Sequence, residues 1–209
     1  MATATTTAET TAETTQPIGR PRAFDHDAVL TAVVDLFWEK GFSATSIDDI
    51  KDRTGLSKSS IYGAFGSKDK LFRTALDRYL ADHHTMVTNV LVDSDGGLDA
   101  IDAFFDRLWE QVDCNGEDRG CLAVNTATEL GSAEPTLIEF GTRHREFLRD
   151  GFTAALERAV ELGEFDRHRV ADSANILLSV VLGLAVMIRG GATAPEIHAH
   201  LDSTKRSLR

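Results

Sequence analysis

The sequence has little cysteine, no apolar run of membrane-spanning length and no excess of positive charge. Only two of its 209 residues are cysteines, Cys114 and Cys121. This argues against a disulfide-braced scaffold and is compatible with the reducing cytoplasm. The longest apolar run, residues 176–188, is interrupted by Ser179 and Gly183 and is shorter than the roughly 20 residues of a membrane helix. We therefore expect a cytoplasmic protein without a membrane partner, in which this run forms a buried or interface helix.

The first 19 residues have no aromatic side chain and are rich in Thr and Ala, with the sequence TAETT repeated. Such a segment cannot bury enough apolar surface to offset the entropy lost on ordering, so we predict a disordered tail. It also has neither the basic n-region nor the apolar h-region of a signal peptide.

The net charge of −11 is unevenly distributed along the chain. Residues 20–80 have 10 Lys and Arg against 9 Asp and Glu, whereas residues 81–209 have 12 against 22. Because phosphates would be repelled by the acidic segment, any contact with nucleic acid is expected in residues 20–80. A near-neutral segment permits such binding but does not by itself indicate it.

The sequence has helical periodicity from residue 26 onward, and no stretch alternates in the manner of a strand. Ser46 with Asp49, and Thr193 with Glu196, have the spacing of helix capping boxes. We predict helices at about residues 26–40, 47–53, 58–65, 67–92, 98–112, 121–130, 135–163, 170–189 and 194–203. The pattern predicts an all-α protein with a three-helix domain at 20–66 and a larger helical domain at 67–209, joined by the long fourth helix.

The short helices 47–53 and 58–65, joined by a Gly-containing turn, are typical of a helix-turn-helix. In that motif the first turn of the second helix enters the DNA major groove. Here this turn contains three Ser residues and Lys58, which can reach base edges or phosphates. Tyr62 and Lys68 are expected to contact phosphates. The alternative is an ordinary small bundle in which the Ser residues are only helix caps.

The segment 24–80 resembles the N-terminal domain of the TetR family of regulators, most specifically in GLSKSSIYGAFGSKDKLF at residues 55–72. Many family members have an aromatic residue before Phe65, where this chain has Ala64, so no phosphate contact is predicted there. Arg20 and Arg22 flank Pro21 in a segment that either enters the minor groove or is a solvated linker. The predicted DNA contacts are Arg20, Arg22, Thr45, Ser46, Ser57, Lys58, Ser59, Ser60, Tyr62 and Lys68.

The resemblance implies that the larger domain binds a small effector in a helical cavity and forms a homodimer through its last two long helices. Residues 170–189 have more apolar surface than one packing face needs, which agrees with dimerisation, although a monomer core helix is the alternative. Predicted ligand-binding residues are Phe105, Trp109, Cys121, Asn125, Thr128, His144 and Phe147. The alternative for the aromatic residues among them is the hydrophobic core.

The segment RGCLAVN, residues 119–125, resembles a Gly-Cys-Leu-x-x-Asn segment in one subgroup of TetR-like regulators, some of which sense electrophiles or oxidants. A helix N-terminus and Arg119 would lower the pKa of Cys121, and a disulfide with Cys114 is conceivable. The alternative, which we favour, is that Cys121 is a small buried residue.

We predict a sequence-specific regulator, a repressor that a small-molecule effector releases from a double-stranded DNA operator. A thiol sensor using Cys121 is the alternative, followed by an effector-free architectural DNA binder. A helical enzyme using Cys121 and His144 is a distant alternative. We expect no enzymatic activity, cofactor or metal, because no catalytic motif or metal-ligand spacing is present and His83, His84, His198 and His200 read as exposed helix residues.

Overall fold

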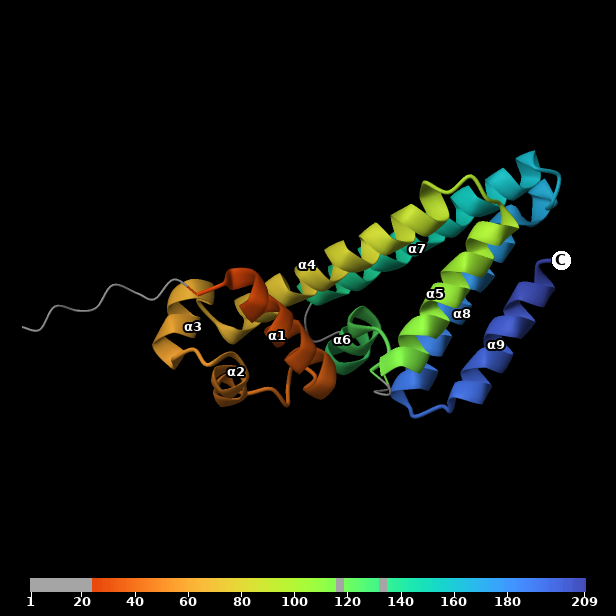
Figure 1. The fold of residues 1–209 in the computed structure, drawn as a ribbon. Helices are drawn as coiled ribbons and strands as arrows, with labels where there is room; N and C mark the ends of the chain where they lie inside the picture. The colour runs from red at the N-terminus through yellow and green to blue at the C-terminus, as the bar shows by residue number, and fades with distance from the viewer. Residues whose placement is uncertain (1–23, 116–118, 132–134) are drawn as a thin grey trace, which may run out of the picture.

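The computed structural model describes residues 24–115, 119–131 and 135–209, and these are helical with no strand (Figure 1). The helices are α1 His26–Lys40, α2 Ile47–Thr54, α3 Lys58–Phe65, α4 Lys68–Val87, α5 Leu98–Asn115, α6 Leu122–Leu130, α7 Pro135–Glu161, α8 Val170–Arg189 and α9 Ala194–Ser207. A π-helical turn, Thr88–Val92, continues α4, and a 3₁₀ turn, Arg167–Arg169, precedes α8. The all-α prediction is confirmed. The predicted disordered tail, residues 1–19, lies outside the described residues, and so do the predicted DNA contacts Arg20 and Arg22.

Local sequence explains where the short helices begin. Ser46 and Asp49 form the predicted capping box of α2: the Ser46 hydroxyl accepts the Asp49 N–H at 3.1 Å, and the Asp49 carboxylate accepts the Ser46 N–H at 2.8 Å. Ser57 caps α3 and Ser67 caps α4 by the hydroxyl alone, which accepts the N–H of Ser60 and of Lys70, respectively. These hydrogen bonds satisfy N–H groups that have no partner within the helix, so each short helix has a defined start.

We call α1–α3 the head and α4–α9 the body. The head packs around Val33, Phe37, Ile50 and Ile61, all at most 2% exposed. The same apolar cluster includes residues of the body, from α4, α6 and α7: Leu71, Phe72, Ala75, Leu76, Leu80, Leu122, Ala123 and Phe140. The head therefore shares its core with the body, and α6 lies where the two meet (Figure 1).

The body forms an elongated helical bundle in which α4 and α7 lie side by side and α5, α8 and α9 pack together (Figure 1). The C-terminal end of α8 reaches α1 of the head. The core of the body includes the fully buried rings of Phe104, Phe105 and Phe152. By length and composition alone, residues Arg167–Arg189 could cross a membrane. One face of this segment instead packs into the core through residues such as Leu177, as a core helix of a water-soluble protein does.

Candidate DNA-binding face and junction site

The starts of α2 and α3 lie together at the free end of the head. Lys58 Nζ is 2.8 Å from a carboxylate oxygen of Asp48, an ion pair that joins the two helices. The residues around the first turn of α3 are all exposed: Ser57, Lys58, Ser59 and Ser60. Tyr62 is 48% exposed, which is high for an aromatic side chain. The structure thus brings together most of the predicted contact residues of the second short helix.

The hydroxyl groups at the start of α3 are connected to one another. Ser57 Oγ accepts the Ser60 N–H at 3.1 Å, and it lies 2.9 Å from the hydroxyls of both Ser59 and Ser60. The hydrogen bond and the charge of Asp48 raise the pKa of Lys58. Asp48 was not predicted as a site residue. Asp48 thus neutralises the one cation of this turn, and any phosphate that Lys58 binds would have to replace this carboxylate.

Three other predicted contacts are placed differently. Thr45 is only 1% exposed and its hydroxyl donates to the Gly41 carbonyl at 2.6 Å, so the prediction that its side chain contacts DNA is wrong. Lys68 is half-buried, with its ammonium 4.3 Å from the ring centroid of Phe42. Ser46 is exposed, although its hydroxyl already caps α2.

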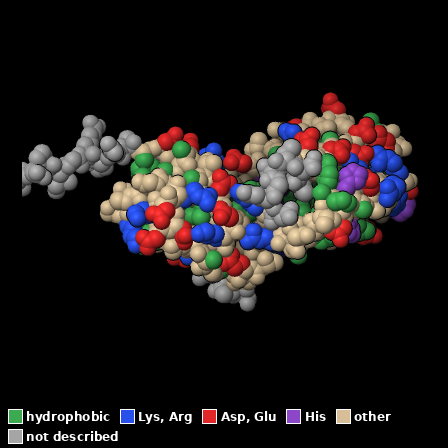
Figure 2. Space-filling model, turned by 60° about the horizontal axis from the view of Figure 1, so that its bottom comes forward, with side chains coloured by type: hydrophobic (Ala, Val, Ile, Leu, Met, Phe, Trp, Pro, Cys, Tyr) green, Lys and Arg blue, Asp and Glu red, His purple; other side chains and the backbone are tan. Residues whose placement is uncertain are grey.

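Charged side chains of both signs are mixed over the head. Figure 2 shows Lys and Arg next to Asp and Glu over this part of the molecule, without a continuous basic patch. Ion pairs such as Lys40–Asp49 at 2.6 Å and Arg53–Glu39 at 2.7 Å account for part of this mixing. The face drawn in Figure 2 therefore offers no broad positive field to attract a polyanion.

The end of α1 is fastened to the body by several hydrogen bonds. Trp38 Nε1 lies 3.1 Å from the carbonyl oxygens of both Arg119 and Gly120, to which it donates. The Arg189 guanidinium, at the end of α8, donates to the carbonyls of Trp38 and Glu39 at 3.1 and 3.3 Å. These carbonyls belong to the last turn of α1, where no intrahelical partner exists. The body thus completes the C-terminal end of a helix of the head.

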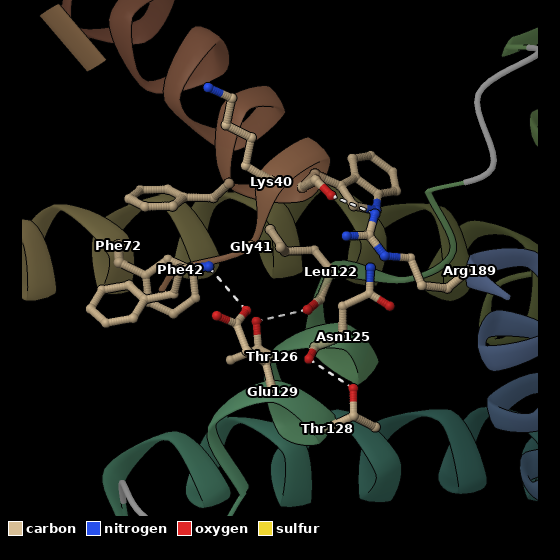
Figure 3. Close-up of a pocket in the computed structure, with 12 residues that line it drawn as sticks. Lys40, Gly41, Phe42, Phe72, Leu122, Asn125, Thr126, Thr128, Glu129 and Arg189 are labelled. Carbon is tan, nitrogen blue, oxygen red and sulfur yellow. Dashed lines mark hydrogen bonds between the residues drawn. The ribbon is translucent and has the colours of Figure 1, made fainter. Parts of the chain in front are cut away.

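Glu129 of α6 holds the turn between α1 and α2 (Figure 3). Its carboxylate accepts the backbone N–H groups of Phe42 at 3.0 Å and Ser43 at 2.6 Å. Partial burial raises the pKa of Glu129, but the hydrogen bonds from Ser43 and Phe42 and the charge of Lys68 outweigh it, and the pKa is lowered. A Cβ at Gly41 would lie 2.6 Å from this carboxylate, so the contact requires glycine there.

A small pocket of about 320 Å³ lies beside this contact and includes two predicted ligand-binding residues, Asn125 and Thr128 (Figure 3). Asn125 Nδ2 donates to the Arg119 carbonyl at 2.7 Å. The Thr128 hydroxyl donates to backbone carbonyls one turn earlier in α6. Both side chains therefore brace α6 and the segment before it.

A larger cavity, of about 770 Å³, lies between the head and the body, and we call it the junction cavity. Its lining comes from α1, α4, α5, α6, α8, α9 and the segment 119–121. The residues are Thr31, Val34, Asp35, Trp38, Arg78, Tyr79, Asp82, His83, Met86, Leu108, Arg119, Gly120, Cys121, Val124, Val181, Leu184, Ala185, Ile188, Ile197 and Leu201. Of the predicted ligand-binding residues, only Cys121 belongs to this lining. The other six predicted residues are not part of it.

The remaining aromatic residues predicted to bind ligand pack elsewhere. Phe105 is fully buried in the body core, which is the alternative that the sequence left open. Phe147 stacks on His84 with ring centroids 3.9 Å apart. Trp109 lies against His198 of α9, with centroids 5.1 Å apart, beside a shallow surface groove.

Cys121 belongs to a buried cluster that joins α4, α6 and α7. The Tyr79 hydroxyl donates to Cys121 Sγ at 3.5 Å, and His144 Nε2 lies 3.9 Å from the same sulfur. Burial raises the pKa of the Cys121 thiol, so the prediction that its position would lower this pKa is wrong. Burial also lowers the pKa of His144 to about 3. The neighbours are thus a neutral thiol and a neutral imidazole, not the ion pair of a nucleophilic cysteine.

The adjacent histidines of α4 are not the exposed residues expected from the sequence. His83 and His84 are both half-buried, and burial lowers the pKa of His83 to about 4. His84 Nε2 lies 3.4 Å from Nδ1 of His144. In the part of the chain that the structure describes, no three His, Cys, Asp or Glu side chains are placed to hold a metal ion. Cys114, proposed as a disulfide partner, has a side chain outside the described set.

Two protein-family models match the chain. One, described as bacterial regulatory proteins of the tetR family, matches residues 29–75. The other, described as a tetracyclin repressor-like C-terminal domain, matches residues 97–203. Together the two matches extend over both the head and the body.

Similar proteins and structures match along most of the chain. The repressor ComR of Escherichia coli is 27% identical over 90% of each chain, and the uncharacterized regulator YezE of Bacillus subtilis is 26% identical over 88% of this chain and 96% of YezE. A solved structure of a cysteine mutant of the TetR family regulator CifR, complexed with 26-bp operator DNA, has a TM-score of 0.81 and 25% identity. The match covers 91% of this chain and 100% of that one.

Proposed function

Because this chain belongs to the TetR family of bacterial regulatory proteins, we propose that it is a sequence-specific transcriptional repressor that a small molecule releases from its DNA operator. The observation that carries the proposal is the exposed first turn of α3. There three serine hydroxyls, Lys58 and Tyr62 face solvent together, next to the start of α2. Hydroxyl, ammonium and phenol groups at a helix start are suited to base edges and phosphates.

A homodimer would place two such helices on DNA. The outer face of α8 supports this assembly, because Ile176 and Val186 are 58% and 52% exposed and lie on the same side as Ser179 and Gly183. Small residues permit close approach of a second copy, and the apolar ones gain from burial. Successive half-sites one helical turn apart, about 34–36 Å, would then match the two α3 helices. DNA binding of this kind is expected in the cytoplasm.

Release by an effector requires that the two states of the protein bind it differently. The shared packing of head and body supports such coupling. Both the Trp38 hydrogen bonds and the Glu129 contact join the head to elements that line the junction cavity or adjoin it. A small change in the body would therefore alter the position of α1, and with it the spacing of the two α3 helices.

The test is binding of the full chain to the DNA upstream of its own gene, measured by fluorescence anisotropy across a salt series. Tyr62→Ala and Lys58→Ala should each weaken binding, and Lys58→Ala should reduce the salt slope by about one, if Lys58 contacts a phosphate. Arg107→Ala, which removes an exposed cation of the body, is the matched control and should bind as the wild type does. Wild-type affinity in both head variants would contradict the assignment of α3. If the wild type shows no specific binding there, a genome-wide selection for its operator is needed before the variants are judged.

Thiol-based sensing through Cys121 is the second candidate, and one observation favours it. Cys121 lines the junction cavity, so a small electrophile that enters the cavity would reach its sulfur. The raised pKa of the thiol works against fast reaction, because the thiolate is the nucleophile. If this candidate is correct, N-ethylmaleimide should release the wild type from DNA and leave Cys121→Ser bound. Equal release of both proteins would reject it.

A further inference from the structure

We propose that the junction cavity binds an uncharged, mainly apolar aromatic compound that has one hydrogen-bonding group, and that this compound is the effector. The inference rests on the proposed function and adds the place and the chemistry of the ligand. Three features of the cavity carry it: an apolar wall, charged lining residues that are already paired, and a buried polar atom without a partner among the described residues.

The wall is mainly apolar and includes aromatic rings from α1 and α4. Val181, Leu184 and Ile188 of α8 form one part of the wall, together with Met86 and the aliphatic residues Leu108, Val124, Ile197 and Leu201. The rings of Trp38, Tyr79 and His83 form another part. A volume of about 770 Å³ is within the range of sites that bury a small organic ligand. An aromatic ligand suits such a lining best, because its rings both fill the space and pack against the aromatic side chains.

The charged residues of the lining are paired with one another. Arg119 Nη1 is 3.2 Å from the Asp35 carboxylate, and Arg78 is 3.1 Å from the carboxylate of Asp82. These residues have equal numbers of positive and negative charges, so the lining has no excess charge to neutralise an ionic ligand. An anion or cation entering the cavity would have to break an ion pair or remain unpaired among apolar groups, which is costly. The cavity therefore selects for a neutral compound.

His83 supplies the hydrogen-bonding position. Its Nδ1 atom is buried and has no hydrogen-bond partner among the described residues, although the ring lies in the lining. The lowered pKa of about 4 keeps the imidazole neutral at pH 7, so Nδ1 either donates or accepts one hydrogen bond. An unpaired polar atom in a buried site is unfavourable. When the His83 ring turns so that Nδ1 faces the cavity, a ligand N–H, hydroxyl or carbonyl would satisfy it. Water filling the cavity is the competing explanation, and it predicts no preference among probes.

A matched pair of fluorescent probes tests the charge preference. N-phenyl-1-naphthylamine is neutral and has one N–H group, whereas 8-anilinonaphthalene-1-sulfonate has the same rings with an added anionic group. We expect the neutral probe to bind the full-length protein at about one site per chain and at least ~10-fold more tightly than the anionic one. Equal binding of the two probes, or no saturable binding of the neutral one, would overturn the proposal.

Cavity-filling variants locate the site. Val181→Phe and Val124→Phe narrow the cavity from α8 and from α6, and each should weaken binding of the neutral probe by about 10-fold or more. Val92→Phe makes the same change at an exposed position outside the cavity and is the control. Because the two variants are on different helices, the test remains valid if one of them fails to fold. Unchanged affinity in both, with circular dichroism matching the control, would show that the probe binds elsewhere.

The hydrogen bond to His83 is tested with a hydrocarbon. In 1-benzylnaphthalene a methylene replaces the N–H, so the wild type should bind it about threefold to tenfold more weakly than N-phenyl-1-naphthylamine. His83→Leu should remove that difference and keep the apolar affinity. A difference that persists in His83→Leu would refute the role of His83. All probe titrations are done without DNA, so they judge the cavity independently of the upstream-DNA assay, which judges the repressor function.

Discussion

Replacing Glu129 should loosen the turn between α1 and α2 while leaving both helices intact. Two backbone N–H groups, of Phe42 and Ser43, donate to its carboxylate at 3.0 and 2.6 Å. Hydrogen bonds to charged groups contribute about 1.5–3 kcal/mol each when they are shielded from water. Glu129 is exposed, so we expect a smaller total loss, about 1–2 kcal/mol of unfolding free energy, in Glu129→Gln at pH 7.

The effect should depend on pH in a defined direction. Because hydrogen bonding lowers the pKa of Glu129 below its ordinary value of 4.5, the folded state favours the carboxylate. Its contribution is complete above the unfolded pKa and is lost as pH falls through the lower, folded pKa. The difference in unfolding free energy between wild type and Glu129→Gln should therefore be largest near pH 7 and should shrink below about pH 4.5.

Urea denaturation at several pH values gives the free energy, and amide hydrogen exchange gives the location. We expect faster exchange at Phe42 and Ser43 in the variant, with the interiors of α1 and α4 unchanged. Glu139→Gln removes an exposed carboxylate of α7 and is the matched control. If Glu129→Gln and Glu139→Gln unfold at the same urea concentration, or if the two amides keep their protection, the assigned role of Glu129 is refuted.

Three further predictions concern the buried cluster and the junction. Burial favours the neutral rings of His83 and His144 and lowers their pKa values from the ordinary 6.5 to about 4 and about 3. Their contribution to the unfolding free energy is therefore complete above pH 6.5, and the unfolding free energy should fall by a few kcal/mol, roughly, as pH drops toward 4. A urea midpoint that does not change over that pH window would contradict this. Gly120→Ala places a Cβ against the backbone carbonyl of Ala185 in α8, at a positive φ, and should lower the unfolding free energy by about 2 kcal/mol or more. Gly63→Ala, in open space within α3, should not lower it. Iodoacetamide should label Cys121 much more slowly in the folded protein than in urea, because burial raises its pKa, and mass spectrometry showing equal rates would disprove that account.

Local features of the fold were predictable from sequence because they depend on neighbours along the chain. The capping boxes at Ser46 and Thr193 formed as predicted, since each needs residues only three positions apart. The exposed start of α3 follows from the same kind of information. Helix ends were less well predicted: α9 continues to Ser207, where the sequence indicated an end near residue 203.

The junction could not be predicted because its contacts join residues far apart in the sequence. Trp38 bonds to carbonyls 81 and 82 positions away, and Glu129 bonds to N–H groups 86 and 87 positions away. The error at Cys121 has the same origin. Its helix start and its neighbour Arg119 favoured a low pKa, but burial beside Tyr79 and His144 has the larger effect, and burial depends on tertiary packing.

The shared core of head and body limits how far the head can be treated as an exchangeable module. Leu122 and Ala123 of α6 and Phe140 of α7 complete the apolar cluster around α1–α3. A chimera that transfers only α1–α3 to another regulator would leave Leu122, Ala123 and Phe140 behind. The transferred helices would then pack against side chains of the other regulator, which fit a different head. New operator specificity in this scaffold is therefore more readily obtained by altering exposed residues of α3 in place than by transplanting the head.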